Sequence, residues 1–188
     1  KSLILITGGH LTPAIAVLAE LKKHGFLNFV WVGHKYNQSG TKFLSPEFQT
    51  VTSQKVKFIE LRTGKLVRKW TKETFLYGIK QFFLIPWGFI KSLYIVIRFR
   101  PKLILSFGGY LAVPIVIIGR IFGAKVITHE QTIVTGLANK IIAKFANKIL
   151  VSWESSLKYF PERKTVLTGN PIRRDIFFIK SETLTKDF

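Results

Sequence analysis

The fold is decided by the stretch LILITGGHLTPAIAVLAEL, residues 3–21. Residues 3–6 are apolar and of strand length, and two glycines follow one residue later. The apolar residues after the glycines recur at the spacing of one helix face: Ala14, Val17, Leu18 and Leu21. The segment therefore predicts a buried strand, a glycine turn and a helix, with Thr12 as the helix N-cap and Pro13 at its first position.

The same alternation continues along the chain. Further strands are expected within these ranges: 28–33, 55–61, 102–110, 124–131, 147–153 and 164–171. Helices are expected at 71–99, 111–122 and 136–146, and the polar segment before residue 55 is expected to be a loop. Strands that are almost wholly apolar and alternate with helices are typical of a parallel sheet covered on both faces. The predicted fold class is α/β, a Rossmann-like doubly wound parallel sheet.

Polar segments follow five of the expected strands. They are 7–10, 108–110, 129–132, 152–154 and 168–173. Because ligands bind beyond the carboxyl ends of parallel strands in open α/β sheets, we expect these five segments to meet at one cleft.

Composition narrows the classes of partner. Lysine and arginine number 29 against 10 acidic residues, a net charge of +19, which favours nucleic acid, phosphorylated substrates or an anionic membrane. The chain has no cysteine, which excludes a disulfide framework and a thiolate metal site. The dinucleotide fingerprint and the P-loop motif are both missing, which argues against a nicotinamide dehydrogenase and a P-loop NTPase.

Two glycine turns are candidate phosphate sites. Gly8-Gly9 and Gly108-Gly109 each lie between an expected strand and an expected helix, where the backbone approaches a ligand closely and the helix N-terminus attracts anions. The alternative is that each pair is only a tight turn. His10 follows the first pair and suits a general base near neutral pH, the alternative being a capping or merely polar loop histidine.

His129 and Glu130 follow another expected strand. As a pair they suit catalysis, metal binding or the anchoring of loops. No third ligand is suitably spaced and H-E-x-x-H is absent, so no metal site is predicted. For His129 we favour loop anchoring.

The stretch 65–102 is basic and aromatic. Its apolar residues are too many for one buried helix stripe, which favours a helix lying in a membrane interface over a helix that packs only into the core. Lys80, Pro86 and Lys91 interrupt the apolar run, and Gly108, Gly109 and Pro114 interrupt the one at 103–119, so neither is expected to span a membrane. The predicted membrane-contact residues are Trp70, Phe75, Ile79, Phe82, Phe83, Trp87, Lys69, Lys72 and Lys80.

Four segments together resemble the MurG family of glycosyltransferase family 28, the peptidoglycan N-acetylglucosaminyltransferases. They are TGGHLTPA (7–14), SFGGYLAVP (106–114), HEQTIVTGLANK (129–140) and GNPIR (169–173), in the order of that family. The resemblance implies the N-terminal half of a GT-B glycosyltransferase. Residues 1–175 would be the acceptor- and membrane-binding domain, and 176–188 would begin the linker to a C-terminal donor-binding domain that this chain lacks.

The resemblance also implies roles for individual residues. His10 and Glu130 would be catalytic. The acceptor diphosphate would be held by Thr7, Gly8, Gly9, Gly108, Gly109 and Tyr110. The cleft would further be lined by Gln131, Thr132, Asn170 and Arg173, although Thr132 stands where the family often has asparagine. No metal and no cofactor are expected, since UDP-N-acetylglucosamine is the donor substrate.

The expected function is that of a hexosyltransferase of peptidoglycan and cell-wall biogenesis. It would transfer N-acetylglucosamine to lipid I, undecaprenyl-diphospho-N-acetylmuramoyl-pentapeptide, to give lipid II at the cytoplasmic face of the bacterial cell membrane, where the enzyme would be peripheral. Alone, the chain would bind acceptor and membrane but transfer little sugar. Two alternatives stay open: a membrane-recruiting subunit of a split GT-B transferase, and a basic nucleic-acid-binding module. The second has no recognisable nucleic-acid motif, and nucleic acid is not an expected partner.

Overall fold

The computed structural model describes residues 2–37, 43–66 and 71–173. In these ranges, seven parallel strands form one sheet in the order β3-β2-β1-β4-β5-β6-β7. The strands are β1 (Ile4–Thr7), β2 (Phe29–Gly33), β3 (Lys57–Glu60), β4 (Leu103–Ser106), β5 (Lys125–Glu130), β6 (Lys148–Val151) and β7 (Thr165–Leu167). The helices are α1 (Leu11–Lys23), α2 (Pro46–Ser53), α3 (Lys72–Phe99), α4 (Ala112–Ile121) and α5 (Leu137–Phe145). Two 3-10 helices, Glu154–Tyr159 and Glu162–Lys164, lie between β6 and β7.

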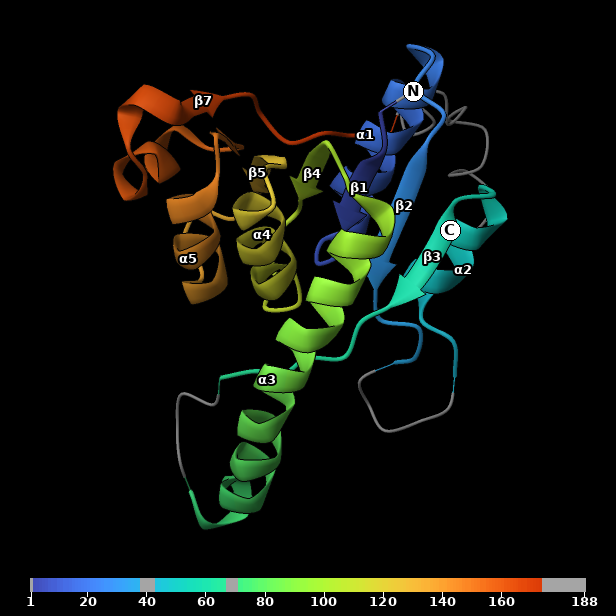
Figure 1. Cartoon of the computed structure of the whole chain (residues 1–188). Coiled ribbons are helices and arrows are strands. Elements are labelled where there is room, and N and C mark those ends of the chain that lie inside the picture. The colour runs from blue at the N-terminus through green and yellow to red at the C-terminus, as the bar shows by residue number, and fades with distance from the viewer. Residues whose placement is uncertain (1, 38–42, 67–70, 174–188) are drawn as a thin grey trace, which may run out of the picture.

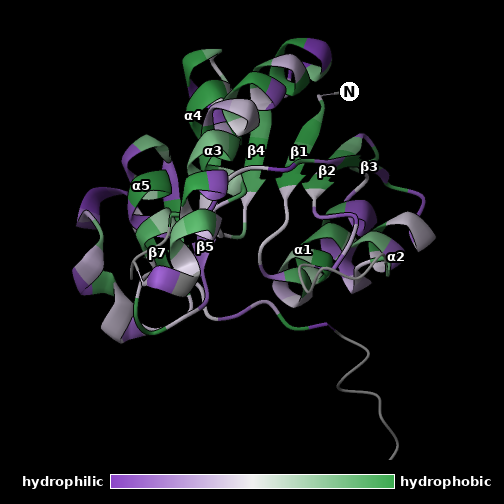
Figure 2. Ribbon diagram, turned by 90° about the horizontal axis from the view of Figure 1, so that it is seen from below, coloured by the Kyte–Doolittle hydropathy of each residue, from purple (hydrophilic) through white to green (hydrophobic). Residues whose placement is uncertain are grey.

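Helices cover both faces of the sheet (Figure 2). Residues of α3, α4 and α5 pack on one face, where Leu5 and Ile104 point. Residues of α1 and α2 pack on the other face, where Ile4 and Ile6 point. Neighbouring residues of one strand thus pack into opposite cores, which is why the central strands β1, β2 and β4 are almost wholly buried. The predicted Rossmann-like doubly wound sheet is confirmed.

The sheet has a switch point between β1 and β4. Chain order runs outward from β1 to β3 in one direction and from β4 to β7 in the other. At such a point the loops after the two central strands diverge to opposite faces and leave a crevice at their carboxyl ends. Both glycine turns lie there, because one follows β1 and the other follows β4.

The start of α1 differs from the prediction. The helix begins at Leu11 with His10 at the N-cap, so Thr12 is not the cap and Pro13 is the third helical residue. Proline is accepted there because the first four backbone N–H groups of a helix have no intrahelical partner in any case. The predicted cap was therefore wrong by two residues.

Helix α2 was expected to be a loop, and this prediction was also wrong. The Ser45 hydroxyl accepts a hydrogen bond from the backbone N–H of Phe48 at 3.0 Å, and Pro46 occupies the first turn. Only Val51 of this polar helix is buried, so it shows little of the apolar periodicity that marks a core helix. Its N-terminal signal, Ser-Pro-Glu, was the feature that could have identified it.

Helix α3 matches the predicted range. Thr71 and Thr74 form a reciprocal capping box at its start, and Pro86 lies inside it. Its N-terminal half extends beyond the layers of the sheet (Figure 1). Thr74–Phe99 is long and apolar enough, by length and composition, to cross a membrane. Two predicted membrane-contact residues, Lys69 and Trp70, lie outside the described residues, as do the proposed domain boundary at 175 and the linker 176–188.

Candidate functional site

The two glycine turns lie directly against each other. A Cβ atom on Gly9 would be 2.3 Å from the carbonyl oxygen of Gly108 and 3.0 Å from that of Phe107. Gly9, Gly108 and Gly109 all have positive φ angles, of 152°, 81° and 80°. A side chain at Gly9 would therefore strain the backbone and clash with backbone atoms of the second turn. The close contact between the two turns requires glycine there.

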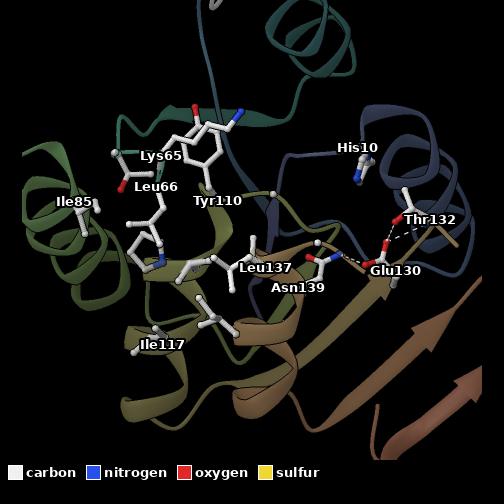
Figure 3. A pocket seen from close by; sticks show the side chains of 18 of the residues that line it. His10, Lys65, Leu66, Ile85, Tyr110, Ile117, Glu130, Thr132, Leu137 and Asn139 are labelled. Atoms are coloured by element: carbon white, nitrogen blue, oxygen red, sulfur yellow. Dashed lines mark hydrogen bonds between the residues drawn. The ribbon is translucent and has the colours of Figure 1, made fainter. Parts of the chain in front are cut away.

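The carboxylate of Glu130 is held at the end of β5. The side chain is 1% exposed. Its Oε1 accepts hydrogen bonds from the Thr132 backbone N–H at 2.9 Å and the Thr132 hydroxyl at 2.6 Å. Its Oε2 accepts from Asn139 Nδ2 at 2.8 Å, which ties β5 to the first turn of α5 (Figure 3). These three donors compensate the carboxylate for the loss of water.

His10 directly follows the first glycine turn and lies on the same side of the site as this carboxylate (Figure 3). It occupies the N-cap position of α1 by its backbone, but its side chain makes no capping hydrogen bond. Burial lowers the pKa of His10 below the ordinary 6.5, and the nearby Glu130 opposes that shift by favouring the imidazolium. The ring is therefore neutral at pH 7, which is the state that accepts a proton.

His129 connects loops. Its Nε2 lies 3.2 Å from the Gly169 carbonyl oxygen and 3.3 Å from Ser152 Oγ. Burial lowers the pKa of His129, with a smaller opposing contribution from the hydrogen bond to Gly169. The side chain joins β5 to the segments after β6 and β7, as predicted for a loop anchor.

A cavity of about 630 Å³ opens beside this cluster. Five residues singled out from the sequence line it: His10, Gly109, Tyr110, Glu130 and Thr132. A second, smaller cavity of about 290 Å³ is lined by Gly8, Gly9, Gly109 and Tyr110, among others. Thr7 is fully buried, and a Cβ added to Gly108 would lie 2.7 Å from Asn139 Oδ1. Neither residue lines either cavity.

The remaining cleft residues lie further out. Gln131 is half-buried, and its carbonyl oxygen accepts a hydrogen bond from Trp153 Nε1 at 3.0 Å. Asn170 and Arg173 are exposed on the segment after β7. None of the three lines the two cavities, so the structure does not gather all five polar segments into one pocket.

Glu47 is not among the residues predicted from the sequence. Its carboxylate lies against Gly8 and Gly33, where a Cβ on Gly8 would overlap it. It accepts hydrogen bonds from the indole N–H of Trp31 at 2.8 Å and the backbone N–H of His34 at 3.1 Å. Burial raises the pKa of Glu47, against the effect of these two bonds. Its position in the first turn of the unrecognised α2 explains why it was overlooked.

The predicted membrane-contact residues on α3 lie at the surface. Phe82 is 63% exposed, Phe83 71% and Trp87 53%. Phe75, Ile79, Lys72 and Lys80 are exposed as well. An amphipathic helix that only packs into the core would bury its large apolar groups, and these are not buried.

The described part of the chain contains no cluster of side chains that could bind a metal ion. Within residues 2–37, 43–66 and 71–173, no three His, Cys, Asp or Glu side chains gather closely enough to hold a metal ion.

Comparison with known proteins places the chain in a family of glycosyltransferases. Residues 6–151 match the model of the glycosyltransferase family 28 N-terminal domain, and the chain belongs to that family. Among curated proteins, the UDP-N-acetylglucosamine:N-acetylmuramyl-(pentapeptide) pyrophosphoryl-undecaprenol N-acetylglucosamine transferase of Borreliella burgdorferi is 37% identical over 171 residues. The same-named transferase of Caldicellulosiruptor saccharolyticus is 36% identical over 173 residues. The predicted resemblance to the MurG transferases is confirmed.

The chain spans less than half the length of these relatives. It is covered over 90% and 91% by the two alignments, which each take in 44% of the relative. Among solved structures, MurG of Acinetobacter baumannii matches with a TM-score of 0.61 at 20% identity, over 93% of this chain and 46% of that one. The UDP-GlcNAc 2-epimerase of Neisseria meningitidis matches with a TM-score of 0.60 at 14% identity, over all of this chain and 51% of the epimerase. At these identities the structures show a shared fold.

Proposed function

We propose that this chain is the acceptor-binding half of a transferase that moves N-acetylglucosamine from UDP-N-acetylglucosamine onto N-acetylmuramyl-(pentapeptide) pyrophosphoryl-undecaprenol. Residues 1–175 form the acceptor- and membrane-binding domain in this proposal, and a C-terminal domain supplies the donor site. The observation that carries it is that His10, Gly109 and Glu130 line one cavity beside the switch point of a family 28 fold.

The proposed chemistry follows from the state of His10. Its lowered pKa keeps the ring neutral near pH 7, so it is available to take the proton of the attacking acceptor hydroxyl. The Glu130 carboxylate stabilises the imidazolium that forms, because it is fixed by Thr132 and Asn139 and does not need to reorient. In this proposal Gly9 and Gly109 bind the acceptor diphosphate through their backbone N–H groups, because those of Gly8 and Gly108 already donate to the Val32 carbonyl oxygen and the Ser106 hydroxyl.

The membrane part of the proposal rests on α3. Large apolar side chains and lysines share its exposed surface, and the whole chain carries a net charge of +19. We propose that α3 lies in the interface of the anionic cytoplasmic leaflet, which makes the protein peripheral. Lys80 and Lys91 lie in the middle of the apolar run, and charges at that depth disfavour a spanning orientation.

Acceptor binding is tested by calorimetric titration of the chain with a soluble acceptor analogue, N-acetylmuramyl-pentapeptide diphosphate carrying one isoprene unit. The analogue is expected to bind, and UDP-N-acetylglucosamine is expected not to bind because its site belongs to the other domain. A chain that binds the UDP-sugar and ignores the acceptor analogue would overturn the proposal.

Membrane binding is tested by sedimentation with phosphatidylglycerol vesicles. The double variant Phe82→Ser/Phe83→Ser is compared with Phe26→Ser/Leu27→Ser, which removes two exposed apolar groups after α1 (47% and 69% exposed). The α3 variant is expected to bind roughly tenfold to a hundredfold more weakly, because two phenylalanines no longer leave water, and the control is expected to bind like the wild type. Equal binding by both would contradict docking through α3. Displacement from the vesicles by RNA would instead favour the nucleic-acid alternative.

A further inference from the structure

The larger cavity is lined by His10 and Glu130 at one end, and the rest of its lining has no role in the proposed proton transfer. It extends from His10 and Glu130 into a space between three helices on one face of the sheet. Its helical walls are built from apolar side chains of α3, α4 and α5: Ile85, Phe89, Val113, Ile117, Leu137 and Ile141. At about 630 Å³ it is of a size that encloses a small organic molecule.

The two ends of this cavity differ in chemistry. In Figure 3, His10, Thr132 and Glu130 lie at one end, and Ile85 and Ile117 lie at the other. On the rim, the ammonium group of Lys65 lies 6.0 Å from the centre of the Tyr110 ring. A ligand that fills the cavity therefore needs a polar end beside His10 and an apolar remainder, and Lys65 on the rim favours a ligand that carries negative charge.

The position of Lys65 is fixed by contacts with α3. Its backbone N–H donates to the Gln81 side chain at 2.9 Å. Its neighbour Gly64 lies so close to α3 that an added Cβ would overlap the Gln81 carbonyl oxygen. The cationic rim and the helix that we propose to lie in the membrane thus form one wall of the cavity.

Sugars and peptides fit the apolar end poorly. Hydroxyl and amide groups placed between Ile85, Ile117 and Leu137 would lose water without gaining a hydrogen-bond partner. A hydrocarbon chain has no such requirement. The apolar end also lies beside the exposed surface of α3, since Ile85 lines the cavity and Phe82, one turn before it, is exposed.

We propose that this cavity binds the first isoprene units of a polyprenyl diphosphate, with the diphosphate at the His10 end, the chain passing toward α3, and Lys65 on the rim attracting the negative charge. The inference rests on the proposed lipid-linked acceptor and deepens it. The lipid tail is then bound by protein at its diphosphate end and by the bilayer beyond α3, so the tail helps to place the sugar.

The test uses farnesyl diphosphate and inorganic diphosphate as probes in calorimetric titrations of the whole chain. Ile117→Trp fills the cavity from α4. Ile121→Trp is the matched control, because it adds the same side chain one turn later on α4 at a position that is 69% exposed and does not line the cavity. Val113→Phe fills the cavity a second way, and thermal unfolding of each variant checks that the fold is retained.

Farnesyl diphosphate is expected to bind the wild type at least about tenfold more tightly than inorganic diphosphate, with a negative heat-capacity change. Ile117→Trp or Val113→Phe is expected to abolish that advantage, and Ile121→Trp to keep it. The proposal is overturned if farnesyl diphosphate gains nothing over inorganic diphosphate, or if folded cavity-filling variants bind it like the wild type. It is also overturned if short-chain phosphatidylglycerol competes equally well.

Failure of this proposal is distinguishable from failure of the proposed function. The acceptor analogue with one isoprene unit reports on the diphosphate, sugar and peptide and depends little on the deep apolar end. A chain that binds this analogue but fails the farnesyl test keeps the proposed function and loses only the assignment of the cavity.

Discussion

Substitution of Gly9 by alanine measures how tightly the two glycine turns are packed. The new Cβ would lie 2.3 Å from the Gly108 carbonyl oxygen, and the backbone has a φ of 152°, which disfavours any L side chain. Backbone strain of this kind costs roughly 1–3 kcal/mol, and forcing an extra methyl group into a packed site costs roughly another 1–3 kcal/mol. Because the clashing atoms are backbone, we expect a total loss of about 3–4 kcal/mol. For a chain of this size the melting temperature should fall by roughly 6–16 °C.

The assay is thermal and urea unfolding followed by circular dichroism, with Gly123→Ala as the control. Gly123 has a φ of 84° but nothing within 4 Å of its added Cβ, so alanine there adds backbone strain alone, about 1–2 kcal/mol. The excess loss in Gly9→Ala measures the contact between the turns. If Gly9→Ala lowers the free energy of unfolding no more than Gly123→Ala does, the turns after β1 and β4 are not in close contact, and the reasoning is refuted.

Two further predictions concern the buried polar groups. Asn139→Leu removes the donor to Glu130 Oε2 and should lower the free energy of unfolding, measured by urea titration, by about 1–3 kcal/mol. The control, Asn170→Leu at an exposed position, should change it little. Equal effects of the two substitutions would contradict the role of Asn139. Burial lowers the pKa of three histidines: His10, His34 and His129. As the pH falls, these histidines are protonated in the unfolded chain before they are protonated in the folded chain. The stability that the three neutral rings contribute is therefore present above pH 6.5 and is lost as the pH falls through their folded pKa values. Imidazole NMR titrations should place all three pKa values below 6.5, and a pKa above 6.5 for His10 would contradict its burial.

Much of the fold was predictable because its signals are local. Short apolar runs of two to four residues marked the strands, and glycine pairs marked the turns after β1 and β4. The range of α3 followed from its length and from the excess of aromatic and aliphatic side chains over one helix stripe. The prediction failed for α2, an eight-residue helix of mostly polar side chains that is stabilised by contacts with other parts of the chain, such as the hydrogen bond between Glu47 and Trp31.

The candidate site was predictable in part. His10, Glu130 and Thr132 were singled out by their places after strands, and the structure brings them to one cavity. Asn139 was quoted within a motif without a role, and only the fold places its amide on the Glu130 carboxylate. Asn170 and Arg173 also follow a strand, but β7 lies at the edge of the sheet, away from the switch point.

The sequence by itself determined most of the strand, turn and helix units and that both faces of the sheet are covered, because hydrophobic period and turn chemistry act over a few residues. The tertiary structure alone decided which units are neighbours. Pairing of β1 with β4 places Gly9 against Gly108, and packing of α3, α4 and α5 on one face encloses the apolar cavity. Hydrophobic burial has no direction, so an apolar run specifies that a surface is covered and not which distant segment covers it.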